Sequence, residues 1–147
     1  MSIEIIKLQP ERYNEATALI WEVFQVFEVP DFPPEGVINY KKILDKTEKE
    51  KNIIFYTAME NDTVVGVLGM RENNHIGYFY VKATHHKRGI GKALFNQMLK
   101  EYCGDITVNA CPYGVQVYTR LGFVPTDTQK NENGIIFTPM KYIRREI

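Results

Sequence analysis

Three apolar segments joined by two very short polar turns restrict the folds open to this chain more than any other feature. The segments are 53–59, 63–71 and 75–81, and each is rich in β-branched or aromatic residues. The two turns, 60–62 and 72–74, hold only three polar residues each. Such a connection joins antiparallel neighbours, because a parallel pair needs a crossover of a dozen or more residues. The sequence therefore predicts an antiparallel three-stranded meander.

Helical periodicity appears on both sides of this meander. Apolar residues from Ala16 to Phe27 recur at i, i+3 and i+4, which predicts an amphipathic helix that ends before Pro30. The other predicted elements are helices at 34–44, 89–102 and 113–121, strands at 3–8, 106–109 and 135–140, and an optional strand near Val124. The order predicts an α/β fold with a mixed, largely antiparallel sheet of six or seven strands flanked by helices.

The size and composition suit one globular domain spanning 1–147. Hydrophobic residues make up 44% of the chain, and its formal net charge is zero. A whole-surface attraction to nucleic acid or to an anionic membrane is therefore not expected. The first residues lack the features of a signal peptide, and no apolar run approaches the roughly 20 residues that span a bilayer. Two cysteines form no disulfide framework, so we expect a cytoplasmic protein.

The segment with the clearest chemical content is 80–94, where an aromatic strand enters a polar loop and then a helix. Gly89 and Gly91 permit positive φ and close approach by a ligand, and the unpaired N–H groups of the helix start attract anions. Basic and imidazole side chains surround this point: His86, Lys87, Arg88 and Lys92. The pattern predicts phosphate or pyrophosphate binding, with a tight turn and a solvated basic rim as the alternative. Ala93 and Leu94 do not fit a Walker A loop or a dinucleotide fingerprint.

Four segments follow one another along the chain: Tyr80-Val81, the block HHKRGIGKAL (85–94), 108–110 and 117–123. In this order and at these intervals, they resemble the GNAT superfamily of acyl-CoA-dependent N-acetyltransferases. The resemblance implies the acyl-CoA N-acyltransferase fold over essentially the whole chain. It also implies an enzyme that transfers an acetyl group from acetyl-CoA to a primary amine of a small molecule or of an exposed protein. The family norm is direct transfer in a ternary complex.

By the same resemblance, backbone N–H groups of the loop would bind the CoA pyrophosphate, and the edge of Tyr80 and Val81 would pair with the pantetheine arm. The expected donor-binding residues are Phe79, Tyr80, Val81, His86, Lys87, Arg88, Gly89, Ile90, Gly91, Lys92, Asn109 and Tyr118. The family usually has Gln or Arg where this chain has His86. This departure leaves backbone binding of phosphate intact but puts a side-chain contact there in doubt.

Tyr118 matches the family tyrosine that protonates the leaving thiolate, the alternative being a tyrosine whose hydroxyl is satisfied locally. His75 is the predicted base, acting through water, since histidine titrates near neutral pH. Glu72 and a water chain remain as alternatives, and His75 could equally be a partly exposed residue at the start of its strand. Asn109 could bind pantetheine or cap a strand end.

The residues contain no metal-ligand set, and Cys111 is expected to be a packing residue rather than a nucleophile. The predicted wall of the acceptor pocket is aromatic, which would favour a flat or cationic amine. Its candidate residues are Trp21, Phe24, Phe27, Phe32 and Tyr40. Helical spacing assigns most of them to the core, and we expect one or two to line a pocket with Tyr78 and Tyr113. Two other functions stay open: a non-catalytic acyl-CoA-binding module, and an interaction domain without cofactor. A homodimer is compatible with the resemblance.

Overall fold

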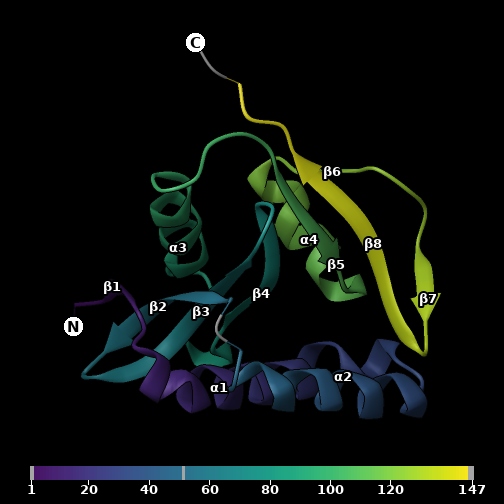
Figure 1. Ribbon diagram of the computed structural model, residues 1–147, viewed down its shortest axis with the longest axis horizontal. Helices are drawn as coiled ribbons and strands as arrows, with labels where there is room; N and C mark the ends of the chain where they lie inside the picture. The colour runs from purple at the N-terminus through teal and green to yellow at the C-terminus, as the bar shows by residue number, and fades with distance from the viewer. Residues whose placement is uncertain (1, 51, 146–147) are drawn as a thin grey trace.

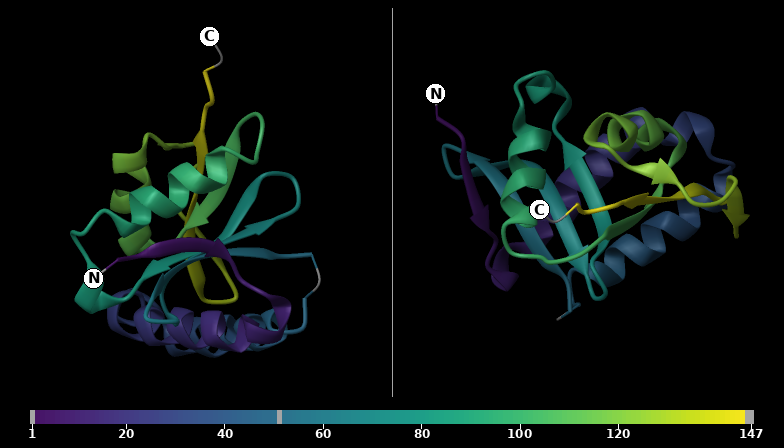
Figure 2. Two further views of the ribbon diagram at one scale, coloured as in Figure 1. Left: turned by 90° about the vertical axis from the view of Figure 1, so that its left-hand side faces the viewer. Right: turned by 90° about the horizontal axis from the view of Figure 1, so that it is seen from above.

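A computed structural model describes residues 2–50 and 52–145, and it shows a mixed sheet with helices on both faces (Figures 1 and 2). The strands are β1 (Glu4–Lys7), β2 (Ile54–Glu60), β3 (Thr63–Arg71), β4 (His75–Val81), β5 (Ile106–Ala110), β6 (Val124–Pro125), β7 (Lys130–Glu132) and β8 (Ile135–Tyr142). The α-helices are α1 (Tyr13–Phe27), α2 (Pro34–Thr47), α3 (Ile90–Leu99) and α4 (Pro112–Leu121). Short 3₁₀ turns are η1 (Pro10–Arg12), η2 (Val29–Asp31) and η3 (Ala83–His85).

The strand order is β1-β2-β3-β4-β5-β8-β6, and β7 pairs with β8. Every pairing is antiparallel except that of β4 with β5. The predicted meander and the mixed, largely antiparallel sheet are therefore confirmed. The described part of the chain has eight strands rather than six or seven, because the segment before the Asn133-Gly134 turn also pairs with β8.

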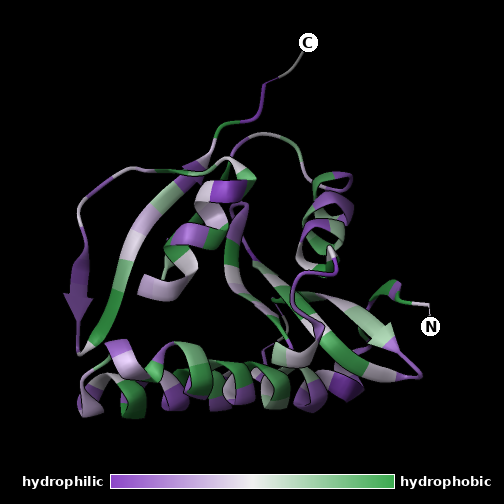
Figure 3. Cartoon of the chain, turned by 180° about the vertical axis from the view of Figure 1, so that it is seen from behind, coloured by the Kyte–Doolittle hydropathy of each residue, from purple (hydrophilic) through white to green (hydrophobic). Residues whose placement is uncertain are grey.

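Two apolar cores, one on each face of the sheet, hold the helices in place. Helices α1 and α2 lie along one face, and α3 and α4 lie on the other (Figure 2). Ile20, Val23 and Leu44 pack with Phe55 and Val67 in the first core. Hydrophobic residues recur along the central strands and along α1, as their green colour shows (Figure 3). Burial on both faces explains why β2 and β3 read as nearly continuous apolar runs rather than alternating ones.

A bulge in β4 decides which side chains face which core. Gly69 pairs with Tyr78 and Met70 pairs with Ile76, so Gly77 is an extra residue on β4. Ile76 points into the core beneath α3, whereas Tyr78, only two residues further on, belongs to the core beneath α1. The bulge thus shifts the alternation of side chains by one residue, so that Ile76 and Tyr78 face opposite cores although an unbroken strand would place them on the same face.

The only parallel pair in the described sheet is very short. Strand β4 pairs with β5 at two positions, His75 with Thr107 and Ile76 with Val108. Beyond these positions β5 keeps its pairing with β8, from Asn109 to Ala110, and no longer pairs with β4. The second half of β4 therefore presents an edge without a strand neighbour on its β5 side.

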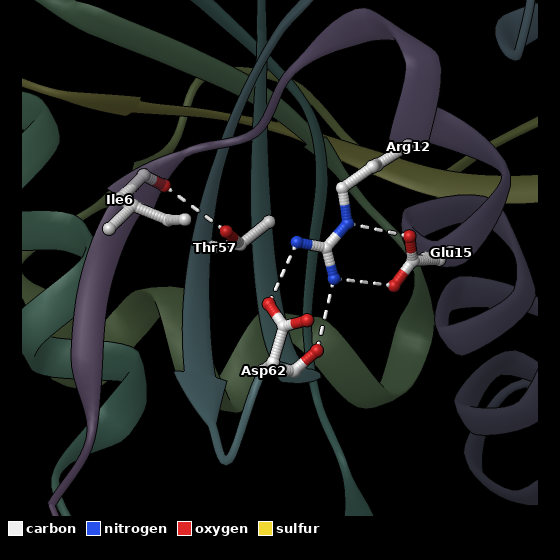
Figure 4. Close-up of polar contacts among 5 residues, drawn as sticks. All are labelled: Ile6, Arg12, Glu15, Thr57 and Asp62. Carbon is white, nitrogen blue, oxygen red and sulfur yellow. Dashed lines mark hydrogen bonds and ion pairs between the residues drawn. The ribbon is translucent and has the colours of Figure 1, made fainter.

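Arg12 fastens the start of α1 to the turn between β2 and β3 (Figure 4). Its guanidinium donates two hydrogen bonds to the Glu15 carboxylate, at 2.7 and 2.8 Å. It donates two more to Asp62, one to the side chain at 2.9 Å and one to the backbone carbonyl at 3.0 Å. This fork fixes the end of the α1 helix that lies far from the unpaired edge of β4.

The β7–β8 hairpin reaches across to the start of α2 (Figure 1). There the backbones of Gly36 and Gly134 touch, so that a Cβ at Gly36 would overlap the Gly134 carbonyl. The Asn39 side-chain amide also donates a hydrogen bond of 2.8 Å to the Asn133 carbonyl. Glycine is required at this crossing because neither backbone has room for a side chain.

We predict that Gly36→Ala lowers the free energy of unfolding by about 1–3 kcal/mol, the usual cost of overpacking a close contact. Gly91→Ala is the matched control, since Gly91 is also helical and a Cβ there meets side chains at ordinary distances of 3.5 Å or more. Urea denaturation of both variants measures the difference. A Gly36→Ala protein as stable as Gly91→Ala would show that the hairpin does not rest on α2.

Candidate active site

Two cavities meet at the unpaired edge of β4. The first, which we call the hairpin cavity, has a volume of about 340 Å³ and is bounded by α2, the start of β4 and the β7–β8 hairpin. The second, the loop cavity, has a volume of about 330 Å³ and is bounded by the segment between β4 and α3 and by α4. Both cavities are lined by Glu28, Phe79, Tyr80, Gly114 and Tyr118. These five residues surround the junction between the two spaces.

The loop cavity contains the backbone expected to bind phosphate. Lys87 and Gly89 have left-handed φ values of 64° and 78°. The left-handed backbone at Lys87, a residue with a Cβ, is strained by about 1 kcal/mol or more. Helix α3 then begins without a side-chain cap, so its first N–H groups have no intrahelical or capping partner. With its positive dipole end facing this space, the loop fits an anionic group.

Most of the expected donor-binding residues line this cavity, and three do not. Those that line it are Phe79, Tyr80, Val81, His86, Lys87, Gly89, Ile90, Gly91 and Tyr118. Arg88 and Lys92 are exposed beside the loop, where their charges act at longer range. Asn109 lines the hairpin cavity instead.

The two adjacent histidines brace the loop. The His86 ring bonds the Val81 carbonyl through Nε2 at 2.8 Å and stacks on Phe27, with 5.1 Å between ring centroids. Because the carbonyl can only accept, His86 carries its proton on Nε2. His85 Nε2 lies 2.9 Å from the Glu60 carboxylate, and this contact lowers the pKa of Glu60. Both rings therefore act on the protein itself, which leaves anion binding to the loop backbone.

Tyr118 stands at the junction with a free hydroxyl. Its side chain is 7% exposed, and its ring packs against Phe79 and Phe123 at centroid distances of 5.9 and 5.2 Å. Within the described chain, the hydroxyl has no hydrogen-bond partner. Burial, with the nearby Cys111 and Glu28, raises the pKa of Tyr118 well above its usual value. Tyr118 is thus a protonated, unengaged phenol facing both cavities.

Glu28 is the residue that the sequence reasoning missed. It follows the last turn of α1 and is only 3% exposed. Its Oε1 accepts a hydrogen bond of 3.2 Å from the Tyr113 N–H in the first turn of α4. Burial raises the pKa of Glu28 to about 7, and Asp31 adds to this while the Tyr113 N–H opposes it. A carboxyl group with such a pKa exchanges protons readily at neutral pH.

A signal for Glu28 was present in the helical periodicity. Phe24 and Ile20 lie four and eight positions before Glu28, and both are fully buried. Glu28 is the next residue at the same spacing, so the spacing places a carboxylate on the apolar face of α1. A charged residue at such a position is rare without a partner or a function.

The other polar groups beside Glu28 remain protonated at neutral pH. The Tyr40 and Tyr80 hydroxyls share a hydrogen bond of 2.8 Å, and burial raises the pKa of both. Burial also raises the pKa of the Cys111 thiol well above its usual value, with Glu28 adding to the shift. Cys111 is therefore a poor nucleophile, as a packing residue would be. Glu28 is the one group here whose ordinary chemistry includes proton exchange near pH 7.

His75, the base predicted from the sequence, lies in the hairpin cavity but not at the junction with the loop cavity. Its Nδ1 is 2.8 Å from the Thr107 hydroxyl, across the short parallel pair. Burial and the nearby Arg71 lower the pKa of His75. Glu72 is exposed in its turn and lines neither cavity. The role of His75 as a base stays a prediction.

The aromatic residues expected to form an acceptor wall divide into three groups. Tyr40 and Tyr78 line the hairpin cavity, whereas Phe27 and Tyr113 line the loop cavity. Phe24, Phe32 and Trp21 line neither cavity, and the first two are core residues. The hairpin cavity is nonetheless aromatic, because Phe79, Tyr80 and Phe137 complete its wall.

The comparison with protein families defines the class to which this fold and site belong. The acetyltransferase (GNAT) domain matches residues 28–144, which is most of the chain. The chain therefore belongs to the GNAT acetyltransferase family, and the resemblance seen in its sequence is confirmed. Acyl transfer is the chemistry of this family. The expected acyl-CoA N-acyltransferase fold is likewise confirmed.

Solved structures show the same fold at low sequence identity. A GCN5-related N-acetyltransferase from Rhodopseudomonas palustris has a TM-score of 0.80 and 17% identity, with 98% of this chain and 97% of that chain covered. PaiA N-acetyltransferase from Thermoplasma acidophilum, in complex with coenzyme A, has a TM-score of 0.74, 20% identity and coverage of 98% and 100%. YjaB from Escherichia coli in its apo form has a TM-score of 0.76, 17% identity and coverage of 97% and 98%.

Three searches gave negative results. A search of curated proteins found no match. Within residues 2–50 and 52–145, no helix combines the length and apolar character needed to cross a membrane. In the same part of the chain, no cluster of three or more His, Cys, Asp or Glu side chains could hold a metal ion.

We predict that Glu28→Gln makes the protein more stable at pH 8 by about 3 kcal/mol and has a much smaller effect at pH 4. The carboxyl has a pKa of about 7 when folded and near 4.5 when unfolded, so its ionisation opposes folding as pH rises between these values. Glutamine cannot ionise, and its carbonyl can still accept the Tyr113 N–H. Denaturation of both proteins at several pH values from 4 to 8 measures the difference in their free energies of unfolding. If the difference in the free energy of unfolding does not increase with pH, Glu28 is not a buried acid of raised pKa.

Proposed function

We propose that this chain transfers an acetyl group from acetyl-CoA to a primary amine, of a small molecule or of an exposed protein, by direct transfer in a ternary complex. The observation that supports this most strongly is the meeting of two cavities at Tyr118 and Glu28. One cavity suits a phosphorylated donor, and the other leads to the same junction from the hairpin side. We place the activity in a single domain. We also place it in the cytoplasm, because Cys103 and Cys111 are both free thiols, as is usual in a reducing compartment.

In this proposal the donor enters through the loop cavity. Backbone N–H groups from Lys87 to Gly91 bind the pyrophosphate, with Lys92 and Arg88 adding positive charge. The pantetheine arm extends β4 as an added strand along Phe79, Tyr80 and Val81, where β5 has left an unpaired edge. This places the thioester at Tyr118, while Asn109 lies beyond it in the hairpin cavity.

The acceptor enters through the hairpin cavity, and three proton transfers accompany the reaction. An aliphatic ammonium has a pKa near 10.4, so a base must help it lose a proton before it attacks. Glu28 takes that proton, directly or through water, because it is ionised in a useful fraction of molecules at neutral pH. The amine nitrogen forms the new bond to the acetyl carbon, the carbon–sulfur bond breaks, and Tyr118 donates its phenolic proton to the leaving sulfur. The second proton of the amine nitrogen then passes to the Tyr118 oxygen, directly or through water, which leaves a neutral amide, a free thiol and the restored phenol.

Tyr118→Phe tests the proposed acid. The change removes only the hydroxyl, so we predict that kcat falls about 100-fold while the Kd of acetyl-CoA stays unchanged. Assays of CoA thiol release give kcat, and calorimetric titration gives the Kd of acetyl-CoA. Tyr142→Phe is the matched control, since Tyr142 packs on Phe95 and Phe123 and lines neither cavity. Unchanged turnover in Tyr118→Phe would refute the role of the acid. If the protein binds acetyl-CoA but releases no CoA thiol in the presence of any amine, it is a non-catalytic acyl-CoA-binding module.

The pH dependence of kcat/KM distinguishes the two candidate bases. With Glu28 as the base, the wild type gains activity as pH rises through about 7, because the carboxyl must be ionised to accept a proton. Glu28→Gln then loses this rise together with about 100-fold of the rate, while His75→Asn keeps the rise. If His75→Asn flattens the profile and Glu28→Gln does not, the base is His75.

A further inference from the structure

We propose that the acceptor is a small aliphatic diamine whose second ammonium group binds Glu132 at the hairpin side of the hairpin cavity. The inference rests on the proposed function and specifies its substrate class. It starts from the charges that line the cavity, which are those of Glu28, Glu132, Arg71 and His75. The net charge of these side chains, after their own ion pairs are counted, determines which charged molecule the cavity accepts.

The two basic side chains contribute little free positive charge. Arg71 is ion-paired with Glu50, and its guanidinium also lies over the Tyr78 ring, 5.6 Å from the centroid. His75 is half-buried, bonded to Thr107 and held by burial in its neutral form at pH 7. A carboxylate ligand therefore finds no unpaired cation among the described residues that line this cavity.

The two acidic side chains are not neutralised in this way. Within the described chain the Glu28 side chain has one hydrogen-bond partner, the Tyr113 N–H, and the exposed Glu132 side chain has no ion pair or hydrogen bond. Glu28 lies at the junction with the loop cavity, whereas Glu132 lies on β7, on the hairpin wall. The cavity thus offers one carboxylate beside the reacting amine and a second one away from it.

The hairpin cavity that both carboxylates line has an aromatic wall. Tyr40, Tyr78, Phe79, Tyr80 and Phe137 line the cavity. Such rings bury the methylene groups of an alkyl chain and attract a cation over their faces. A chain of methylene groups with an ammonium at each end complements this surface along its whole length. An amino acid does not, since its carboxylate would face Glu28 or Glu132.

The hairpin holds Glu132 at a fixed place on this wall. The backbone contact between Gly36 and Gly134 and the hydrogen bond from Asn39 to Asn133 tie the turn that follows Glu132 to α2. Residue Glu132 itself pairs with Ile135 across the hairpin. Because the wall is anchored, the distance between the two carboxylates selects a chain length.

The test compares three series of acceptors at equal chain length. These are α,ω-diamines from 1,3-diaminopropane to 1,6-diaminohexane, the corresponding n-alkylamines, and the corresponding ω-amino acids. Thiol release from acetyl-CoA gives kcat/KM for each. We expect the best diamine to exceed its alkylamine at least tenfold, the amino acids to be the poorest acceptors, and the diamine preference to weaken at high salt.

Variants connect this preference to Glu132. Glu132→Gln reduces the ratio of diamine to alkylamine kcat/KM about tenfold, and Glu22→Gln leaves the ratio unchanged. Glu22 is the matched control because it is exposed on α1 and lines neither cavity. A diamine no better than its alkylamine, or a preference that survives Glu132→Gln, overturns this inference while acetyl transfer stands. Acetyl-CoA binding with no acetylation of any amine overturns the proposed function as well.

Discussion

The two-residue parallel pairing of β4 with β5 is the constraint on which the site depends. His75 and Ile76 hold the strands together, and immediately afterwards β5 stays with β8 while β4 continues paired only with β3. A longer pairing would satisfy the backbone of β4 internally and close the space between the cavities. The bulge at Gly77 acts at the same point, because it places Tyr78 on the opposite face of the sheet from Ile76. One break in the sheet therefore creates a cofactor-sized edge, a passage and the side chains that line it.

The site is built from groups that stability alone would not favour. Lys87 has a left-handed backbone, the start of α3 has no cap, and the Tyr118 hydroxyl has no partner in the described chain. Glu28 is a carboxyl group placed among aromatic rings, with a single backbone N–H as its partner. Each feature costs stability when the cavities hold only water, and each suits a ligand that would supply the missing contact. These destabilising features lie around one junction, and this clustering indicates a functional site. The same features spread over the molecule would not.

Much of the fold was predictable because it follows from local patterns. The short turns at 60–62 and 72–74 define the meander, and apolar periodicity defines α1. Strand β7 could not be foreseen, since Lys130–Glu132 is polar and becomes a strand only by pairing with β8. The loop and Tyr118 were found through short motifs. Glu28 was not, because its role arises from the approach of α4, which begins more than eighty residues later in the chain. Asn109, expected to bind the donor, lines the hairpin cavity, and its role stays a prediction.

The central claim is that the strand separation brings a thioester and an amine together between Tyr118 and Glu28. The most direct measurement is a crystal structure of this protein with coenzyme A bound. We predict that the pyrophosphate lies on the backbone from Lys87 to Gly91 and that the pantetheine runs along β4 from Val81. The sulfur should then lie within hydrogen-bonding distance of the Tyr118 hydroxyl. Coenzyme A bound elsewhere, or bound in the loop cavity with its sulfur directed away from Tyr118, would contradict the account.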